Sequence, residues 1–271
     1  MGLFDNSGST IIYIMVDIWR EDVCIRFGSV DRSNRLTLGS IFSFFQEAAI
    51  SHAADLGVGV EDFRCSGQVW ILSRLSLFVE RRPMYGETIE VSTWPRRWEK
   101  LFAIRDYEIR DAQGIAVIRG RAGWLVLDIE KRKPLRIEPV LGFLPPNDGI
   151  DAFRQSSVNP SAPSALSQRE NLVKVAERIA NYSDIDYYGH ANNARYVQWI
   201  QDVTDMDLLA NADEFRLDIN YLSEVLPRET VELWTVSLGE AAPGFAYEGR
   251  RPGTGQVVFR AELRAGCGDQ G

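Results

Sequence analysis

The segment from Ser183 to Asp202 contains one of the two histidines of the chain together with three aspartates, so it could carry out acid–base chemistry. Asp186 and His190 precede the pair Asn192 and Asn193, and an apolar helical pattern follows. An unperturbed imidazole can donate or accept a proton near neutral pH. The first backbone N–H groups of a helix lack partners within it and attract negative charge. The pattern is therefore typical of a catalytic site, but also of an ordinary capped loop, because Asp, Ser and Asn are common helix caps.

The residues before this segment predict one long helix with strands around it. Residues 11–27 are rich in β-branched and aromatic side chains, which predicts a strand. From residue 38 to about 56 the apolar side chains recur at helical steps, at Leu38, Ile41, Phe42, Phe45, Ala48, Ala49 and His52. His52 is interpreted as a core or interface histidine. Strand-like segments separated by turn residues follow at Val69–Glu80, Thr88–Trp94, Leu101–Arg110 and Ile115–Asp128. We therefore expect an antiparallel sheet curled around the helix.

The rest of the chain returns to the same order of elements. Residues 134–165 are rich in proline and form the only credible linker. After it we expect a strand at Leu172–Ile179 and a helix from Asn193 to about Leu209. Further strands are predicted near Phe215–Leu222, Thr230–Leu238, Phe245–Glu248 and Gln256–Ala265. The predicted fold class is α+β, a tandem repeat of two units at residues 11–133 and 166–266.

The two units can be aligned by eye. Asp186 falls on Asp31 at an offset of 155 residues, and Glu229 falls on Glu87 at an offset of 142. We interpret the difference as residues lost between the helix and the sheet of the second unit.

The alignment also indicates which unit can hold the chemistry. Arg35 stands at the position equivalent to His190, and Arg82 stands at the position equivalent to Glu224. If the reaction needs an imidazole and a carboxylate, only the second unit supplies both. The first unit is then free to bind substrate and to act as a scaffold.

Composition excludes several classes of function. The formal net charge is −8, which argues against wholesale nucleic-acid binding. The early apolar run, residues 11–16, is too short to span a bilayer, and we find no secretory signal. The three cysteines are widely spaced and odd in number, which indicates reduced thiols and a cytoplasmic location, without metal-ligand spacing. No phosphate-binding fingerprint or nucleophile elbow is present, so we expect neither a cofactor nor a metal.

Several short stretches occur in an order that resembles the acyl-acyl-carrier-protein thioesterases, a double hot-dog family of bacteria and plant plastids. They run from about Trp19 to Ala265 and include Val69–Arg74, Tyr85–Glu87, Val91–Trp94, Arg105–Tyr107, Arg119–Trp124, the SDIDYYGHANNARYVQWI segment and Asn220–Glu224. The resemblance implies a tandem hot-dog fold. It also implies that the first unit holds the acyl chain, that the second unit is catalytic, and that the partner is an acyl carrier protein. Pairing of hot-dog units leaves a homodimer of chains open.

The family's catalytic pattern resembles Asp-x-Asn-x-His with an acidic residue downstream, and Asp186, His190 and Glu224 match it. Two positions depart from the pattern. Tyr188 stands at the family's Asn position, so the role of that amide is lost or passes to the phenol, to Asn192 or to Asn193. The Cys of plant members is a valine here, which excludes a cysteine nucleophile at that position. A plastid transit peptide is not recognised, so the resemblance implies a bacterial-type enzyme.

Thioester hydrolysis needs an activated water and a donor for the oxyanion. We expect Glu224 to act as the base and His190 to bind the carbonyl oxygen or the leaving sulfur, assisted by a backbone N–H of the helix that begins at Asn193. Asp186 is expected to fix the imidazole. The opposite assignment, with His190 as the base, uses the same residues and remains open.

Binding of the acyl chain and of its carrier involves other residues. Phe45, Trp70 and Leu72 are candidates to line the acyl tunnel, although aromatic residues at such spacing also form cores. An acidic carrier would need a basic docking patch, and three clusters are candidates: Arg81-Arg82, Arg96-Arg97-Lys100 and Lys131-Arg132-Lys133.

Rival functions remain on the same fold, because fold does not determine function. One is a non-catalytic module that binds acyl thioesters. The others are a hot-dog acyl-coenzyme-A thioesterase and an enoyl-thioester hydratase or dehydratase.

Overall fold

The computed structural model of the protein describes residues 18–142, 147, 149–153, 165–239 and 243–266. The first unit begins with a strand, continues with the predicted long helix and then forms most of its sheet. Its main elements are β1 (Trp19–Cys24), α1 (Leu38–Asp55), α2 (Val60–Cys65), β2 (Gln68–Val79), β3 (Thr88–Glu99), β4 (Phe102–Arg110), β5 (Ala116–Asp128), β6 (Lys133–Pro134) and α3 (Glu138–Leu141), with a 3-10 turn η1 (Phe27–Ser29).

The second unit repeats this order with a shorter helix. Its elements are β7 (Val173–Ile179), the 3-10 turn η2 (Tyr182–Asp184), α4 (Asn193–Val203), α5 (Met206–Asn211), β8 (Phe215–Tyr221), β9 (Thr230–Ser237), β10 (Gly244–Arg250) and β11 (Val257–Ala265). No helix among the described residues is both long and apolar enough to cross a membrane.

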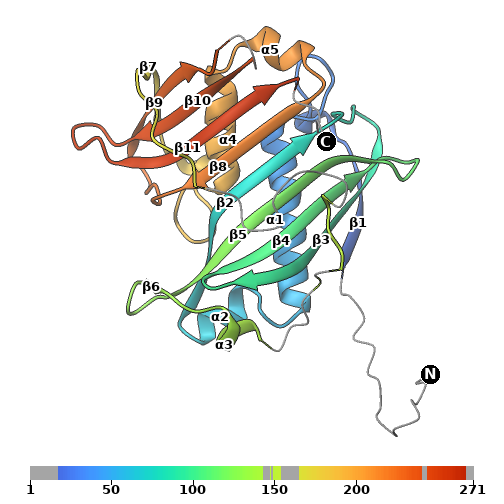
Figure 1. The fold of residues 1–271 in the computed structure, drawn as a ribbon, viewed down its shortest axis with the longest axis vertical. Helices are drawn as coiled ribbons and strands as arrows, with labels where there is room; N and C mark the ends of the chain where they lie inside the picture. The colour runs from blue at the N-terminus through green and yellow to red at the C-terminus, as the bar shows by residue number, and fades with distance from the viewer. Residues whose placement is uncertain (1–17, 143–146, 148, 154–164, 240–242, 267–271) are drawn as a thin grey trace, which may run out of the picture.

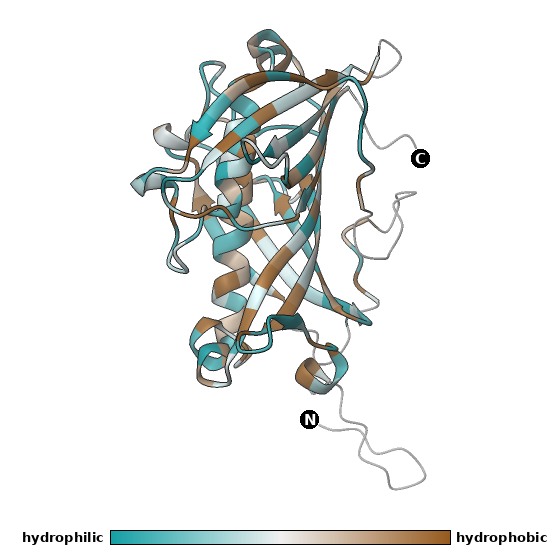
Figure 2. Cartoon of the chain, turned by 90° about the vertical axis from the view of Figure 1, so that its left-hand side faces the viewer, coloured by the Kyte–Doolittle hydropathy of each residue, from teal (hydrophilic) through white to brown (hydrophobic). Residues whose placement is uncertain are grey.

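All strands among the described residues belong to one antiparallel sheet. Their order is β1-β3-β4-β5-β2-β8-β11-β10-β9-β7, with β6 paired to β5. The two units meet where β2 pairs with β8, from Arg74 opposite Asn220 to Val79 opposite Phe215. Figure 1 shows the continuous sheet in front of the two helices, and the turned view of Figure 2 shows both helices on the same side of it. The expectation of a helix wrapped by an antiparallel sheet is confirmed in each unit.

Helix α1 forms where the sequence predicted it. The Thr37 side chain caps the helix by accepting a hydrogen bond from the backbone N–H of Ser40 at 3.1 Å. The predicted apolar face is buried against the sheet. On it Phe45 stacks on Tyr107 of β4 with ring centroids 4.5 Å apart. Gly120 of β5 leaves room for the Phe45 ring, since a Cβ at this glycine would lie 2.4 Å from Phe45 Cε2.

The backbone reproduces the repeat with the offsets found in the sequence. Ile25 N–H bonds to the carbonyl of Glu87, and Ala180 N–H bonds to that of Glu229, offset by 155 and 142 residues. In the same way Leu36 N–H bonds to Pro83 and Ala191 N–H bonds to Val225. The two units are therefore copies of one structure, and the residues that differ between them occupy equivalent positions.

Three sequence expectations about elements are corrected. The helix predicted to reach Leu209 ends at Val203, because Thr204 turns to an extended conformation and Asp205 caps the separate helix α5. The strand predicted to end at Trp94 continues as β3 to Glu99, with a register shift after Pro95. A proline is tolerated there because β1 pairs with β3 only as far as Thr93, which leaves this part of β3 at an edge.

The third correction concerns the first strand. It covers Trp19–Cys24 instead of extending to residue 27, and the part of the prediction at residues 11–17 lies outside the described residues.

The described part of segment 134–165 packs on the first unit. Ile137 and Leu141 are buried in a small apolar cluster with Val126. On the sheet face away from α1, Asp151 forms ion pairs with Arg96 at 2.7 Å and with Arg121 at 2.6 Å. These contacts fix the described end of this segment to the sheet.

Candidate active site

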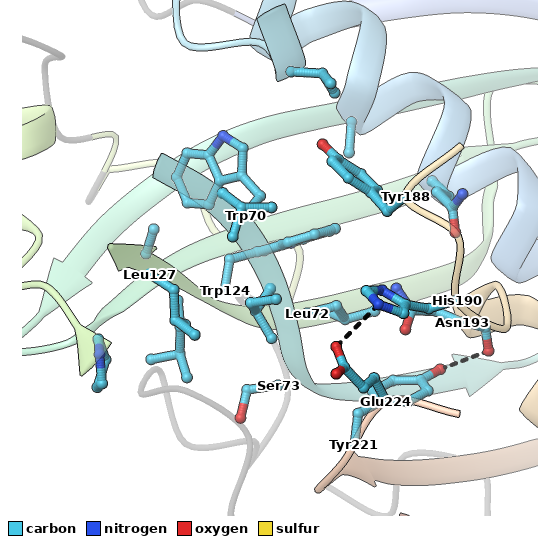
Figure 3. Close-up of a pocket in the computed structure, with 18 of the residues that line it drawn as sticks. Trp70, Leu72, Ser73, Trp124, Leu127, Tyr188, His190, Asn193, Tyr221 and Glu224 are labelled. Atoms are coloured by element: carbon cyan, nitrogen blue, oxygen red, sulfur yellow. Dashed lines mark hydrogen bonds and ion pairs between the residues drawn. The ribbon is translucent and has the colours of Figure 1, made fainter. Parts of the chain in front are cut away.

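A cavity of about 1020 Å³ lies where the two units meet. Its lining comes mainly from α1, β2, β4 and β5 of the first unit, and from the loop before α4, the start of α4 and the end of β8 in the second. Figure 3 shows Trp70 and Leu127 at one end, and His190, Asn193, Tyr221 and Glu224 at the other. The cavity thus joins an apolar compartment of the first unit to polar side chains of the second.

His190 and Glu224 form a direct pair in this cavity. The Nε2 atom of His190 lies 3.2 Å from Oε2 of Glu224. The His190 side chain is 36% exposed and that of Glu224 is 59% exposed, so water reaches both groups. His190 belongs to the loop between η2 and α4, and Glu224 follows β8. The structure therefore brings all three predicted catalytic residues to this cavity and pairs two of them, His190 and Glu224, directly.

Arg251 holds the backbone that carries Glu224. Its guanidinium donates to the Glu224 carbonyl oxygen at 2.6 Å and to Ser223 Oγ at 3.0 Å. The same guanidinium pairs with Glu229 at 3.0 Å, and this hydrogen bond lowers the pKa of the Glu229 carboxyl. Sequence reasoning missed Arg251 because it lies far along the chain, after β10, and no local pattern marks it.

Asp186 acts on the loop and not on the imidazole. Its Oδ1 accepts the backbone N–H of Tyr188 at 2.9 Å, and its own N–H donates to the His190 carbonyl at 2.9 Å. Gly189 completes the turn with φ of +81°, a conformation that favours glycine. Within the described residues, Glu224 is the side chain paired with the His190 ring. Asp186 therefore shapes the turn that presents His190.

Tyr188 lines the cavity on the side of the first unit. In Figure 3 its ring leans toward the Trp70 end and away from Glu224. Burial raises the pKa of its phenol, and the charge of Asp186 adds to this effect, so the hydroxyl stays protonated at neutral pH. The neighbouring Tyr187 donates from its hydroxyl to Glu61 of α2 at 3.1 Å, which ties the loop to the first unit.

The two adjacent asparagines have different positions. Asn192 is the N-cap of α4, and its Oδ1 accepts the backbone N–H of Ala194 at 2.9 Å. It does not belong to the cavity lining, so its predicted contact with substrate is not supported. Asn193 is the first residue of α4 and does line the cavity. Its carbonyl oxygen accepts the hydroxyl of Tyr221 at 3.0 Å.

Two of the three predicted acyl-lining residues face the cavity. Trp70 and Leu72 line it, whereas the prediction for Phe45 is wrong because its ring is buried against β4 and β5. The cavity instead contacts the next face of α1, through Gln46, Ala49, Ile50 and Ala53. Trp124 of β5 also lines the cavity and was missed. Its position opposite Leu72 in the sheet, on the face toward α1, could not be known without the strand register.

His52 of α1 contacts Arg105 of β4. His52 is fully buried, as predicted, and its Nδ1 lies 3.1 Å from an Nη atom of Arg105. Arg105 also contributes to the cavity lining.

In the first unit, arginines in ion pairs occupy the positions equivalent to His190 and Glu224. Arg82, the counterpart of Glu224, is buried and donates to Asp31 at 2.7 Å and to the carbonyl of Leu209 in α5. Arg35, the counterpart of His190, pairs with Asp213 of the second unit. These arginines join the units and leave no imidazole or carboxylate pair like that of His190 and Glu224.

The basic clusters are only partly available at the surface. Arg81, Arg82, Arg96, Arg97 and Lys131 each pair with a carboxylate. Lys100, Arg132 and Lys133 form no ion pair within the described part of the chain, and Arg132 lines the cavity. Over the same residues, no group of three His, Cys, Asp or Glu side chains could hold a metal ion.

Two family models match the chain. The acyl-ACP thioesterase N-terminal domain matches residues 16–141, and the acyl-ACP thioesterase C-terminal domain matches residues 168–264. A chloroplastic acyl-[acyl-carrier-protein] hydrolase of Cuphea viscosissima is 23% identical over 223 residues, 76% of this chain and 52% of the relative. A chloroplastic palmitoyl-acyl carrier protein thioesterase of Arabidopsis thaliana is 23% identical over 224 residues, with the same coverage. The chain thus spans about half the length of these curated relatives.

Solved structures share the fold. An acyl-ACP thioesterase from Bacteroides thetaiotaomicron superposes with a TM-score of 0.73 at 25% identity, covering 91% of this chain and 97% of that one. The 12:0-ACP thioesterase from Umbellularia californica superposes with a TM-score of 0.75 at 21% identity, covering 91% and 96%. The predicted α+β double hot-dog fold is confirmed.

Proposed function

The chain belongs to the acyl-ACP thioesterase family, and we propose that it hydrolyses the thioester bond of a fatty acyl chain carried on acyl carrier protein. The observation that carries this proposal is the pair of His190 and Glu224, 3.2 Å apart and accessible to water, at one end of a cavity whose other end is apolar. The products are the free fatty acid and the carrier with its thiol restored.

The chemistry follows from what this pair can do. A water beside Glu224 gives a proton to the carboxylate as its oxygen attacks the thioester carbon, a role that contributes on the order of 10²–10⁴-fold. The carbonyl oxygen becomes an oxyanion, the C–S bond breaks as the carbonyl reforms, and the leaving sulfur receives, directly or through His190, the proton that the carboxylate took from the water. His190 faces the same cavity and can bind the carbonyl or protonate the sulfur. If His190 is instead the base and Glu224 binds the water, the same two residues carry out the reaction.

The two units have different parts in this proposal. Residues 11–133 hold the acyl chain, residues 134–165 connect the units, and residues 166–266 carry the catalytic pair. Trp70, Leu72 and Trp124 give the first unit an apolar lining suited to an alkyl chain. Arg82 and Arg35 occupy the equivalent place of the first unit, which supports one reactive site per chain.

Docking of the acidic carrier is assigned to the positive charges that the fold leaves without carboxylate partners. Arg132 lies in the cavity lining, and Lys133 follows it as the first residue of β6. Arg132→Glu should raise the KM for carrier-bound substrate and leave the KM for the same acyl group on a small thiol unchanged. The proposal also includes a cytoplasmic location, for which the widely spaced cysteines are the support.

The test is to incubate purified protein with acyl-carrier-protein and acyl-coenzyme-A thioesters and to follow the release of free thiol. Glu224→Gln and His190→Ala should each lose most of the turnover while the protein stays folded. Arg35→Ala is the matched control from the equivalent position and should retain most of it. Release from coenzyme A alone would favour a coenzyme-A thioesterase. Binding without release would favour a non-catalytic module, and a change in the acyl chain without thiol release would favour a hydratase.

A further inference from the structure

Hydrolysis of a thioester needs a donor aimed at the oxygen that becomes negative in the transition state. His190 and Glu224 are engaged with each other, so another polar group should supply this hydrogen bond. Three groups near the pair are unsuitable. The Tyr188 ring leans toward the acyl end of the cavity (Figure 3). Asn192 uses its Oδ1 as a helix cap and lies outside the lining. The Ser223 hydroxyl accepts from Arg251 and donates to the Glu224 carbonyl oxygen.

Asn193 has the position and the free donors that this role requires. It lines the cavity and is drawn in Figure 3 at the same end as His190 and Glu224. Its side-chain amide makes no hydrogen bond with any residue in the described part of the chain, so both of its N–H groups are available. It is also the first residue of α4, where the backbone N–H groups lack partners within the helix and the helix dipole favours negative charge.

Tyr221 fixes the residue that carries this amide. Its hydroxyl, at the end of β8, donates to the Asn193 carbonyl at 3.0 Å. Burial raises the pKa of Tyr221 well above its ordinary value, so the phenol remains a donor over the working range of pH. Tyr196, one turn further along α4, packs edge-to-face on the Tyr221 ring with centroids 5.4 Å apart. The first turn of α4 is thereby tied to the strand that leads to Glu224.

We propose that the Asn193 side-chain amide donates to the thioester carbonyl oxygen as it becomes an oxyanion, and that Tyr221 is the positioning residue for it. This inference rests on the proposed hydrolysis. No proton is transferred by the amide: the oxyanion keeps its charge until it reforms the carbonyl, when the C–S bond breaks. Because Asn193 holds the carbonyl oxygen, His190 does not have to bind it and gives a proton to the departing sulfur. Glu224, which took a proton from the water, replaces that proton across their 3.2 Å contact.

The experiment compares Asn193→Ala, Asn193→Ser and Tyr221→Phe with the wild-type chain. Loss of one oxyanion donor typically lowers kcat by about 10²–10³-fold, so we expect this loss for both Asn193 variants with little change in KM. The pH–rate profile should keep its shape, because no titrating group is removed. Tyr221→Phe should lower kcat by about 10-fold, because a misplaced donor raises the activation free energy by roughly 1.4 kcal/mol.

Two further measurements separate these roles from structural ones. A double variant, Asn193→Ala with Tyr221→Phe, should be no slower than Asn193→Ala alone, because Tyr221 acts only through Asn193. A thioether analogue of the substrate has no carbonyl oxygen, so its Kd should be the same for wild type and for the Asn193 variants. A trifluoromethyl ketone analogue, which presents an oxyanion-like oxygen, should bind more weakly to the variants.

The outcomes distinguish this inference from the proposed function. If wild-type protein releases thiol and both Asn193 variants keep wild-type kcat, the donor role is wrong while hydrolysis stands. Additive losses in the double variant, or equal weakening of the two analogues, would show that Asn193 and Tyr221 support the fold only. If wild type releases no thiol from any substrate, the proposed function fails first. Should Asn193→Ala not fold, Asn193→Ser keeps a small polar residue at the helix start and decides the question.

Discussion

The buried arginine of the first unit gives the sharpest test of the asymmetry between the two units. Arg82→Met keeps most of the aliphatic volume but removes the charge. The Arg82 side chain is 1% exposed. The variant loses its 2.7 Å ion pair with Asp31 and its hydrogen bond to the Leu209 carbonyl oxygen. Removing one partner of a buried pair costs about 3–5 kcal/mol. Asp31 is 22% exposed and keeps its backbone bonds to Ser33 and Arg35, so water recovers part of this loss.

We therefore expect Arg82→Met to lower the free energy of unfolding by about 2–3 kcal/mol, which corresponds to a fall in Tm of roughly 5–10 °C for a chain of this size. Thiol release per folded molecule should not change, because Arg82 lies at the place equivalent to Glu224 and not in the reactive site. Urea and thermal unfolding measure the first quantity, and a thiol assay at 20 °C measures the second.

Arg32→Met is the control, since Arg32 and Asp207 form a pair in which both side chains are more than half exposed. An exposed pair contributes about 0–1 kcal/mol, so this variant should unfold almost like wild type. The interpretation would be refuted if Arg82→Met had wild-type stability, or if it lost turnover in proportion to Glu224→Gln. The latter result would mean that the first unit takes part in the chemistry.

Three other changes have defined outcomes. Gly120→Ala places a Cβ 2.4 Å from the ring of Phe45, so it should lower stability by about 1–3 kcal/mol, and wild-type denaturation midpoints would contradict this packing. The Arg251 hydrogen bond depresses the pKa of Glu229 below its ordinary 4.5, so the stability from this pair is complete above that pH and is lost as the pH falls through the depressed value. Arg251→Met should therefore make unfolding in this acidic range less dependent on pH, and an unchanged acid-unfolding curve would count against the pair. Salt should raise the KM for carrier-bound substrate much more than that for a small-thiol substrate, since exposed charges are screened beyond about 8 Å at physiological ionic strength; equal effects on both would remove electrostatic docking.

The sequence predicted the parts of the fold that depend on local patterns. The apolar steps of α1 and the alternation in its facing strands specify those elements without tertiary information. The end of α4 could not be predicted in this way, because the apolar pattern continues into α5. The break depends on Thr204, whose hydroxyl bonds to Ile200 and to the distant Tyr247, and on the cap from Asp205.

The candidate site was predicted as far as residue types and the repeat allowed. His190 and Glu224 differ from arginines at equivalent positions, which is visible in the sequence. The separate roles of Asn192 and Asn193 are not visible in the sequence. They depend on the residue at which α4 begins, which makes Asn192 the cap and Asn193 the first helical residue. Phe45 was misassigned because the apolar face of α1 is broad. The glycine that leaves room for its ring against the sheet, Gly120, lies on a strand far along the chain.

The seam between β2 and β8 has a consequence for the proposed binding of an acyl chain. Trp70 and Leu72 precede the seam on β2, and Tyr221 ends the strand paired with it. The register of β2 against β5 shifts after Leu72, and a bulge of this kind bends a strand locally. The catalytic pair and the apolar end of the cavity are therefore linked through hydrogen-bonded strands, which rise about 3.3 Å per residue. We therefore expect the usable depth of the cavity to change when the side chains along its lining are exchanged.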